Sequence, residues 1–395
     1  MMSRIIGAAM LTAATLTLPA TETSASQFGY AQSQSVTPQQ FLQAGERLSV
    51  DAGPAIRRAL ARGLPVRFPA GDYVVRPDPA ATPRLAFRTY SIRIPDNAHL
   101  IFDPGARIVQ APGAGSWVRT VSFQDADNVR VEGELWVDAN VSAISAANNE
   151  QMHGVMLFNT SNARIDAIRS ENARGDNVMI GGDNNSAGSH DVWIGTIRAS
   201  TAGRKNLVLH SVRNVRIDRA ILDNRAGGAR LYGGKPTGSD GHSLDAEPDK
   251  FTGAVQNSAS IGEVVTYGSG NDFSAGTNAR QASAYRLDIG TFKSYVEPRR
   301  GVAPWIQYAI TVSVRDLQIS GASGDSPSEI RYAARLLVDR LRLTGASRGK
   351  PLLWIAPARG EAPDVRIGTE DVRNASGPGV QRGGRPLWRA APSAP

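Results

Sequence analysis

Short stretches in which apolar and polar residues alternate recur along the chain from residue 128 onward, and this repetition limits the possible folds more than any other feature. Each stretch reads as a half-buried strand between turns rich in Gly and Asn. The stretches that end at Val131, Ile165, Ile194, Ile217 and Ile261 lie 34, 29, 23 and 44 residues apart. This period is too irregular for a propeller, and no helical periodicity separates the strands. Stacked coils with loops of variable length, a parallel β-helix, are therefore predicted.

The segment before the repeats has the pattern of an end cap for such a stack. Ile56, Ala59 and Leu60 fall at helical spacing within residues 54–62, and Gly63 follows them. The next residues alternate like a strand, turn, and alternate again. Because a coil cannot bury its inward face alone, the end of a solenoid needs such a cover. We expect a short capping helix followed by the first strands.

The beginning of the sequence has the layout of a secretory signal peptide. Arg4 supplies a positive charge, Ile5 to Leu18 form an apolar run, and small residues follow up to Ala25. The run is shorter than the roughly 20 residues that a membrane span needs. We expect residues 1–25 to be a signal peptide, the protein to be secreted or periplasmic, and no segment to span a membrane.

Two further segments are expected to lie outside the coils. Residues 26–49 are rich in Gln and Ser and are predicted to be a linker, and residues 376–395 are predicted to be a disordered tail. The β-helix with its N-terminal cap then covers residues 50–375. A chain of this length often has two domains, but β-helices of this size are commonly one unit.

Composition excludes several classes of chemistry and narrows the partner. The chain has no cysteine, which excludes thiolate catalysis, cysteine-ligated zinc and disulfides. Its formal net charge is +8, which favours an acidic partner. For an exported protein, we expect that partner to be an anionic polysaccharide and not nucleic acid. The sequence leaves the oligomeric state open.

A second strand of several coils can be aligned without gaps, and it carries the candidate site. The segments 154–158, 177–181 and 206–210 align, and 243–247 continues the series. Period-two alternation then turns Asp245 and Glu247 outward, toward solvent, about 6.5–7 Å apart along the strand. The same stacking places a histidine, His210, one coil below Glu247, at about 4.8 Å.

Other ionisable and polar residues are predicted to surround this face. They are His242, Asp240 and Asp249 beside the strand, Asn271 and Asp272 from the next coil, and Arg204 and Lys205 from the coil below. A further polar segment, with Asp176, Asp183, Asn184 and Asn185, is predicted to be a solvated turn. The alternative that it lines the groove stays open.

Two segments resemble proteins of the pectate-lyase superfamily. "AIRRALARG-LPVRFPAGDYVV" (55–75) resembles the N-terminal cap of that superfamily, and "GRKNLVLHSVRNVRIDRAILDN" (203–224) with "DGHSLDAEPD" (240–249) resembles a coil that leads into "G-I-D-I-E-P". The resemblance implies an all-β fold, a single-stranded right-handed parallel β-helix with a short N-terminal capping helix. It covers residues 50–370 loosely and 203–249 closely. The Asp and Glu of the motif fall on Asp245 and Glu247.

The resemblance implies a carbohydrate-active protein but leaves its reaction open. The catalytic motifs of pectate lyases (W-I-D-H), polygalacturonases and mannuronan epimerases (D-P-H) are absent or incomplete, with Gly241-His242-Ser243 only a partial echo of one of them. We expect lyase or epimerase chemistry on an acidic polysaccharide, in which His210 or Lys205 removes the proton beside a uronate carboxylate. Arg204, or a calcium ion held by Asp245, Glu247 and Asp249, would neutralise that carboxylate.

Two alternatives stay open. Asp245 and Glu247 could be the acid and base of an inverting glycoside hydrolase, whose carboxyl groups stand about 6.5–9.5 Å apart. The same carboxylates could instead bind a structural cation or form ladders with Arg204 and Lys205, in a glycan-binding or structural solenoid without catalysis. Fold alone does not decide between them.

Overall fold

The structure is a computed structural model, and the chain divides into two compact units, Met1–Ser33 and Gln34–Pro395. All described residues belong to the second unit. They are residues 34–81, 89–113, 117–140, 151–182, 188–225, 242–246, 258–268, 271–276, 285–295, 304–307, 310–323, 328–330, 335–347, 351–355, 364–375 and 379–382. None of the helices within these ranges is long and apolar enough to cross a membrane.

The N-terminal cap is larger than predicted. The helix α2 (Gly53–Leu60) confirms the predicted capping helix, and its Ile56 is fully buried in the core. Before it lie a 3-10 helix, η1 (Pro38–Phe41), and a single turn, α1 (Leu48–Asp51). Residues 34–49 are therefore part of the cap and not a linker, because Val36 bridges to Val66 of the first coil.

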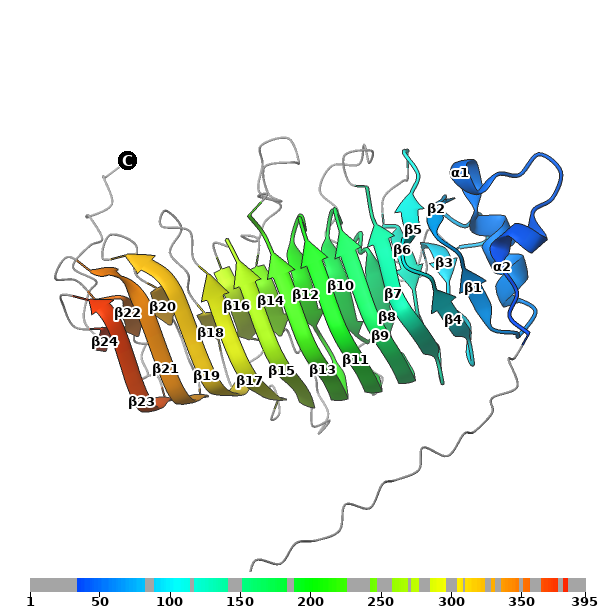
Figure 1. The fold of residues 1–395 in the computed structure, drawn as a ribbon. Coiled ribbons are helices and arrows are strands. Elements are labelled where there is room, and N and C mark those ends of the chain that lie inside the picture. The colour runs from blue at the N-terminus through cyan, green and yellow to red at the C-terminus, as the bar shows by residue number, and fades with distance from the viewer. Residues whose placement is uncertain are drawn as a thin grey trace, which may run out of the picture. The chain divides into compact units, whose positions relative to one another are not determined.

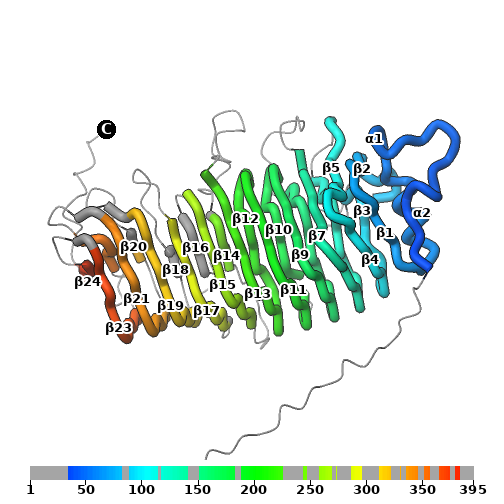
Figure 2. Tube along the Cα trace, viewed as in Figure 1, coloured from blue at the N-terminus to red at the C-terminus, as the bar shows by residue number. Residues whose placement is uncertain are grey.

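Parallel strands form three sheets in the described part of the chain (Figures 1 and 2). The long-strand sheet contains β1 (Val66–Phe68), β2 (Gly71–Val75), β4 (His99–Phe102), β5 (Ala106–Gln110), β7 (Arg130–Asp138), β9 (Ser161–Glu171), β11 (Ser189–Ser200), β13 (Val212–Asp223), β15 (Ser258–Tyr267), β17 (Tyr285–Tyr295), β19 (Ile310–Ser323), β21 (Arg335–Ser347) and β23 (Asp364–Ala375). The short-strand sheet contains β3 (Tyr90–Arg93), β6 (Arg119–Ser122), β8 (Val155–Phe158), β10 (Asp176–Gly181), β12 (Lys205–Leu209), β14 (His242–Ala246), β16 (Asn271–Gly276) and β18 (Pro304–Gln307). A third sheet contains β20 (Ser328–Ile330), β22 (Leu353–Ile355) and β24 (Val380–Arg382).

From β6 to β19 the chain alternates between the long-strand and short-strand sheets, and from β19 to β24 it alternates between the long-strand sheet and the third sheet. Strands pair with the equivalent strand of the next coil, as β10 does with β12 and β12 with β14. This register confirms the gapless alignment made from the sequence. Inward side chains of both sheets form one continuous apolar core. Among its fully buried members are Val178, Ile180, Leu207, Leu209, Leu244 and Ala246.

The Asn or Asp at the start of each repeat lies at a corner where the backbone changes direction. Asn128, Asn162, Asp191 and Asn214 all have left-handed backbone conformations, with φ between 49° and 56°. Asn and Asp tolerate this conformation better than other residues with a side chain. Stacked side chains also bond to one another, as Asn214 Nδ2 donates to Asp191 Oδ1 over 2.6 Å. The recurring Asn or Asp therefore marks a corner of the coil.

The longer strands bend halfway along their length, and glycine makes the bend possible. A Cβ atom at Gly262 would lie 2.5 Å from the carbonyl oxygen of Asp218, and one at Gly290 would lie 2.4 Å from that of Gly262. Such distances leave no room for a side chain. Glycine in a strand commonly marks a tight bend of this kind.

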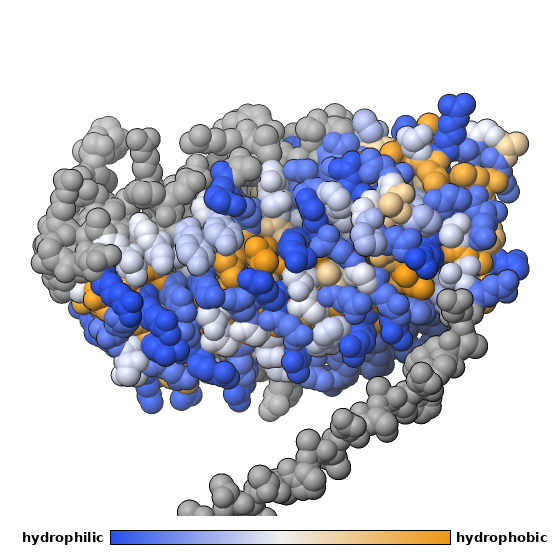
Figure 3. Space-filling view, viewed as in Figure 1, coloured by the Kyte–Doolittle hydropathy of each residue, from blue (hydrophilic) through white to orange (hydrophobic). Residues whose placement is uncertain are grey.

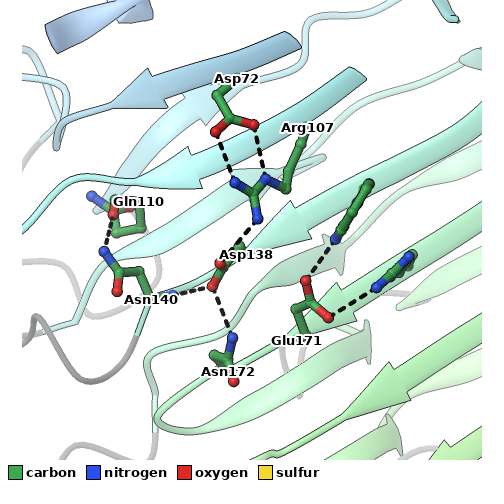
Figure 4. A network of polar contacts seen from close by, with 9 residues as sticks. Asp72, Arg107, Gln110, Asp138, Asn140, Glu171 and Asn172 are labelled. Carbon is green, nitrogen blue, oxygen red and sulfur yellow. Dashed lines mark hydrogen bonds and ion pairs between the residues drawn. The ribbon is translucent and has the colours of Figure 1, made fainter. Parts of the chain in front are cut away.

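An arginine–tryptophan stack joins the first coils on the surface. The Trp136 ring lies between the guanidinium groups of Arg107 and Arg169, at 5.3 and 3.8 Å from its centroid. Its Nε1 donates to Glu171 over 2.8 Å, and Arg107 forms two hydrogen bonds with Asp72. Figure 4 shows the carboxylates of this network, which link four successive strands.

The described C-terminal end does not match the predicted tail. Val380–Arg382 form β24, which pairs with β22, so the ordered coils continue past residue 375. On β23, Glu370 stands in register with the fully buried Leu341 of β21. Arg382 lies 3.1 Å from this carboxylate.

Candidate active site

The outer face of the short-strand sheet is buried, which corrects the predicted orientation of Asp245. Asp245 is in register with Val208, and Val208 with Met179 and Met156, whose side chains form an apolar cluster separate from the main core. Asp245 is therefore on the outer face, as alternation indicated, but it is only 1% exposed and does not turn toward solvent. Parallel sheets are usually covered on both faces, which alternation within one strand does not reveal.

Asp245 forms an ion pair with Lys205. Lys205 starts β12 and is in register with His242 of β14, so its side chain crosses to the next rung to reach the carboxylate. Lys205 is 3% exposed. A buried charge of either kind needs an opposite charge beside it, and this pair supplies one to each.

His153 and Asp176 form a second buried pair near the same edge of the sheet. His153 Nδ1 lies 3.3 Å from Asp176 Oδ2, and Arg204 Nε lies 3.7 Å from the other carboxylate oxygen. Burial lowers the pKa of His153 well below its ordinary value, and the positive charges of Arg119 and Arg204 lower it further. The imidazole is therefore neutral. Its Nε2 is buried and has no hydrogen-bond partner within the described ranges.

Arg119 brings another positive charge to this region. It is fully buried at the start of β6, and burial lowers its pKa to about 9. Its Nη1 donates to the carbonyl oxygen of Trp117 over 2.8 Å. The register aligns Val121 of β6 with Val155 of β8, so Arg119 and His153, each two residues earlier, occupy equivalent positions on neighbouring strands.

These residues form one row along the starting edge of the short-strand sheet, which we call the edge row. Its members come from consecutive coils and are Arg119, His153, Asp176 and Lys205, with Arg204 and Asp245 beside them. An asparagine ladder inside the coil fixes the neighbouring backbone. Asn177 Nδ2 donates to Asn206 Oδ1 over 2.7 Å, and Asn206 Nδ2 donates to Asn224 Oδ1 over 2.9 Å.

The structure brings only some of the predicted site residues together. Lys205, Arg204 and Asp245 lie in or beside the edge row, and the backbones of His242 and Asn271 continue its register. His210 follows the opposite end of β12, where Ser211 Oγ lies 3.1 Å from its Nδ1.

Several predicted residues cannot be placed in the site. Asp240, Glu247 and Asp249 lie outside the described residues, as does the side chain of Asp272. The predicted calcium site of Asp245, Glu247 and Asp249 is therefore described only at Asp245. In the described ranges, no three His, Asp or Glu side chains are grouped to hold a metal ion.

Sequence reasoning did not find Arg119 or His153 and misplaced Asp176. Asp176 is 1% exposed and not part of a solvated turn. Each of the three stands just before the aligned segment of its strand. Extending the aligned segments by one residue toward the N-terminus would have placed His153 and Asp176 in one row with Lys205, and adding the strand that begins at Arg119 would have completed it.

Comparison with solved structures identifies the fold. The A-modules of the mannuronan C-5 epimerases AlgE6 and AlgE4 of Azotobacter vinelandii match 88% of this chain, with TM-scores of 0.57 and 0.54 and sequence identities of 12% and 13%. The match covers 99% and 97% of those modules. Bacteriophage phi29 gene product 12 matches 86% of the chain with a TM-score of 0.46 and 13% identity, and the chain spans 57% of the length of that protein.

No protein-family model and no curated protein matches the sequence. The fold is nevertheless defined. It is the right-handed parallel β-helix of the pectin-lyase-like type, as the sequence predicted.

Proposed function

We propose that this protein is a carbohydrate-active enzyme that acts on an acidic polysaccharide by removing the proton beside a uronate carboxylate. The observation that carries the proposal is the buried edge row. It holds three cations, Arg119, Arg204 and Lys205, against the carboxylates of Asp176 and Asp245, with a neutral His153 among them. Among the residues that the structure describes, positive charges outnumber negative ones in this row, and such an excess in a desolvated site favours an anionic ligand.

The chemistry follows from the roles that these groups can take. The edge row is closed to solvent in this structure, so the proposal requires that substrate binding displace what covers it. A substrate carboxylate beside Arg119 and Arg204 would then be neutralised, which makes the proton on the neighbouring carbon more acidic. The backbone N–H of Asp176 lies 3.3 Å from His153 Nδ1, so Nε2 can act as a base only in the tautomer whose Nδ1–H donates to Asp176 Oδ2 instead; in that tautomer Nε2 would accept the proton, and Asp176 would stabilise the resulting imidazolium. The bound anion would also offset the two guanidinium charges that lower the pKa of His153, so the base would strengthen when substrate binds.

The carbanion formed in this step has two outcomes. In a lyase, its electron pair forms a double bond while the neighbouring C–O bond breaks, and the leaving oxygen takes a proton. In an epimerase, a proton returns to the same carbon from the opposite face. The ammonium of Lys205, paired with Asp245 in the edge row, would supply that proton in either case.

The inverting-hydrolase alternative is less well supported. It needs Asp245 and Glu247 as acid and base on either side of a water molecule, but Asp245 is buried in an ion pair with Lys205, and Glu247 lies outside the described residues. The same pair neutralises Asp245, so we do not include a calcium ion there. We further propose that the protein works outside the cytoplasm, on the basis of the signal-like segment 1–25.

Incubation of the purified protein with acidic and neutral polysaccharides, with and without a chelator, tests the proposal. A lyase product absorbs in the near ultraviolet, an epimerase exchanges the C5 proton for deuterium in D2O, and a hydrolase releases reducing ends without either signal. His153→Gln should abolish turnover and keep the thermal melt close to that of the parent. The matched control is His190→Gln, since His190 lies on the long-strand sheet. Turnover of neutral polysaccharides only, or full activity of His153→Gln, would contradict the proposal.

A further inference from the structure

A groove of about 760 Å³ crosses the outer surface of the long-strand sheet where its strands bend. It runs over β13, β15, β17 and β19 and reaches Asp339 on β21. We call it the bend groove. The apolar core of the coil separates it from the edge row, because inward side chains of both sheets meet in that core.

The floor of the bend groove is bare backbone. Gly262 and Gly290 stand at equivalent positions of adjacent strands, where a Cβ atom would collide with a carbonyl oxygen of the strand before. Ile261 and Ile289 beside them point into the core and are buried. No side chain therefore fills the concave corner, and a ligand can approach the main chain closely.

Charged side chains form the walls of the bend groove. Arg216 Nε donates to Asp218 over 2.9 Å, and Arg286 Nε donates to Asp288 over 2.7 Å. Both guanidinium groups make these contacts through Nε, so their terminal nitrogens project into an exposed space. Figure 3 shows hydrophilic side chains over most of the long-strand sheet in this view.

Arg315 is the third arginine that lines the bend groove, and Asp339, which also lines it, occupies the equivalent position on β21. Arg315 continues the column of Gly262 and Gly290 on β19 and is exposed. It makes no ion pair or side-chain hydrogen bond with any residue that the structure describes. A guanidinium group has five N–H donors in a planar fork that matches a carboxylate.

We propose that the bend groove is a second carbohydrate-binding site, for a uronate-containing chain, separate from the edge row. Neighbouring strands lie about 4.8 Å apart, a spacing close to the length of one sugar ring. A chain lying along the groove meets a polar side chain at successive rungs. Arg315 takes a carboxylate, and Asp218 and Asp288 accept hydroxyl groups. That the ligand contains uronate rests on the proposed function. That a ligand binds here rests on the shape and side chains of the bend groove.

Such a site holds the polymer and performs no chemistry. A chain bound along the bend groove stays attached while another part of it occupies the edge row, which raises the local concentration of substrate. The expected consequence is a lower apparent KM on long chains, with kcat on short oligomers unaffected by the groove.

The experiment is a binding titration of short fluorescent oligouronates with the full chain carrying His153→Gln, so that no turnover occurs. The test variant adds Arg286→Ala and Arg315→Ala. The matched control adds Arg366→Ala, because Arg366 also bonds through Nε to an aspartate two residues away and is as exposed as Arg286, at 69% for both side chains. The bend groove does not include Arg366 among its lining residues.

We expect two binding events in the parent and in the Arg366→Ala control. The test variant should lose affinity at one of them by at least about tenfold, the effect of removing a charged hydrogen-bonding group. Equal binding by the test variant and the parent, or an equal loss in the control, would overturn the proposal. In another outcome, binding depends on Arg286 and Arg315 while the protein with the native His153 turns over no oligouronate. That result would support the bend groove as a binding site and contradict the proposed function.

Discussion

The ammonium group of Lys205 pairs with the carboxylate of Asp245, although the register partner of Lys205 is His242. The pair is diagonal and joins two coils on a face that is closed to solvent. Removing one partner from a buried pair costs more than removing both, because the remaining charge is left desolvated. Lys205 and Asp245 should therefore be strongly coupled in stability.

We expect Asp245→Leu alone to lower the free energy of unfolding by about 3–5 kcal/mol. The double variant Lys205→Met with Asp245→Leu should recover most of this loss, since two apolar side chains replace the pair. Urea unfolding of the parent, both single variants and the double variant measures the coupling energy. Additive losses in this cycle would show that the two charges do not depend on each other.

The pH dependence of stability should carry the signature of His153. Its pKa in the folded protein lies well below that of the unfolded chain, so the unfolded state binds the proton more tightly. Its contribution to stability is present above about pH 6.5 and falls by roughly 1.4 kcal/mol for each pH unit below it. Urea unfolding between pH 5 and pH 8 should show a shallower slope for His153→Gln. A slope of His153→Gln equal to that of the parent would contradict the lowered pKa of His153.

Gly290→Ala should destabilise the bend of the long-strand sheet. The added methyl group would lie 2.4 Å from the carbonyl oxygen of Gly262, a backbone atom that cannot move without the strand. A loss of about 1–3 kcal/mol is expected, typical of overpacking. Thermal melts compare it with Thr291→Ala at the next position. A Gly290→Ala protein as stable as that control would show that the backbone can yield.

The stack of Trp136 between two arginines should contribute to the stability of the N-terminal coils. Trp136→Leu removes two cation–π contacts and the hydrogen bond to Glu171, with an expected loss of about 1–2 kcal/mol. Trp136→Phe keeps an aromatic face between Arg107 and Arg169 and should lose less. Chemical unfolding measures both. Equal losses in the two variants would mean that the ring face contributes nothing beyond the hydrogen bond.

The fold could be predicted from the sequence because the same pattern of residues recurs in successive coils. The Asn or Asp at each corner and the apolar residues at inward positions recur in every coil, so one irregular loop does not hide them. The surroundings of Asp245 could not be predicted in the same way. Alternation places a side chain on one face of a strand, but what covers that face comes from other parts of the chain.

The edge row was harder to predict for a related reason. Arg119, His153 and Asp176 come from successive coils and form no local motif, and each lies just outside the segment that aligns by its apolar pattern. Only the strand register brings them beside Lys205. These residues are far apart in the sequence, which is why the row is hard to find there. Stacked coils nevertheless bring one residue from each repeat to the same edge of the sheet, so side chains of different chemistry can lie next to one another.

Glu370 has a consequence for how these molecules behave at high concentration. On the last described strand of the long-strand sheet, it occupies the inward column that Leu341 fills one rung earlier, and Arg382 neutralises it. A strand of another molecule that paired with β23 would have to desolvate this ion pair, and a charged side chain at such a position disfavours pairing. We therefore expect Glu370→Leu to make the protein more prone to aggregate, as light scattering would detect.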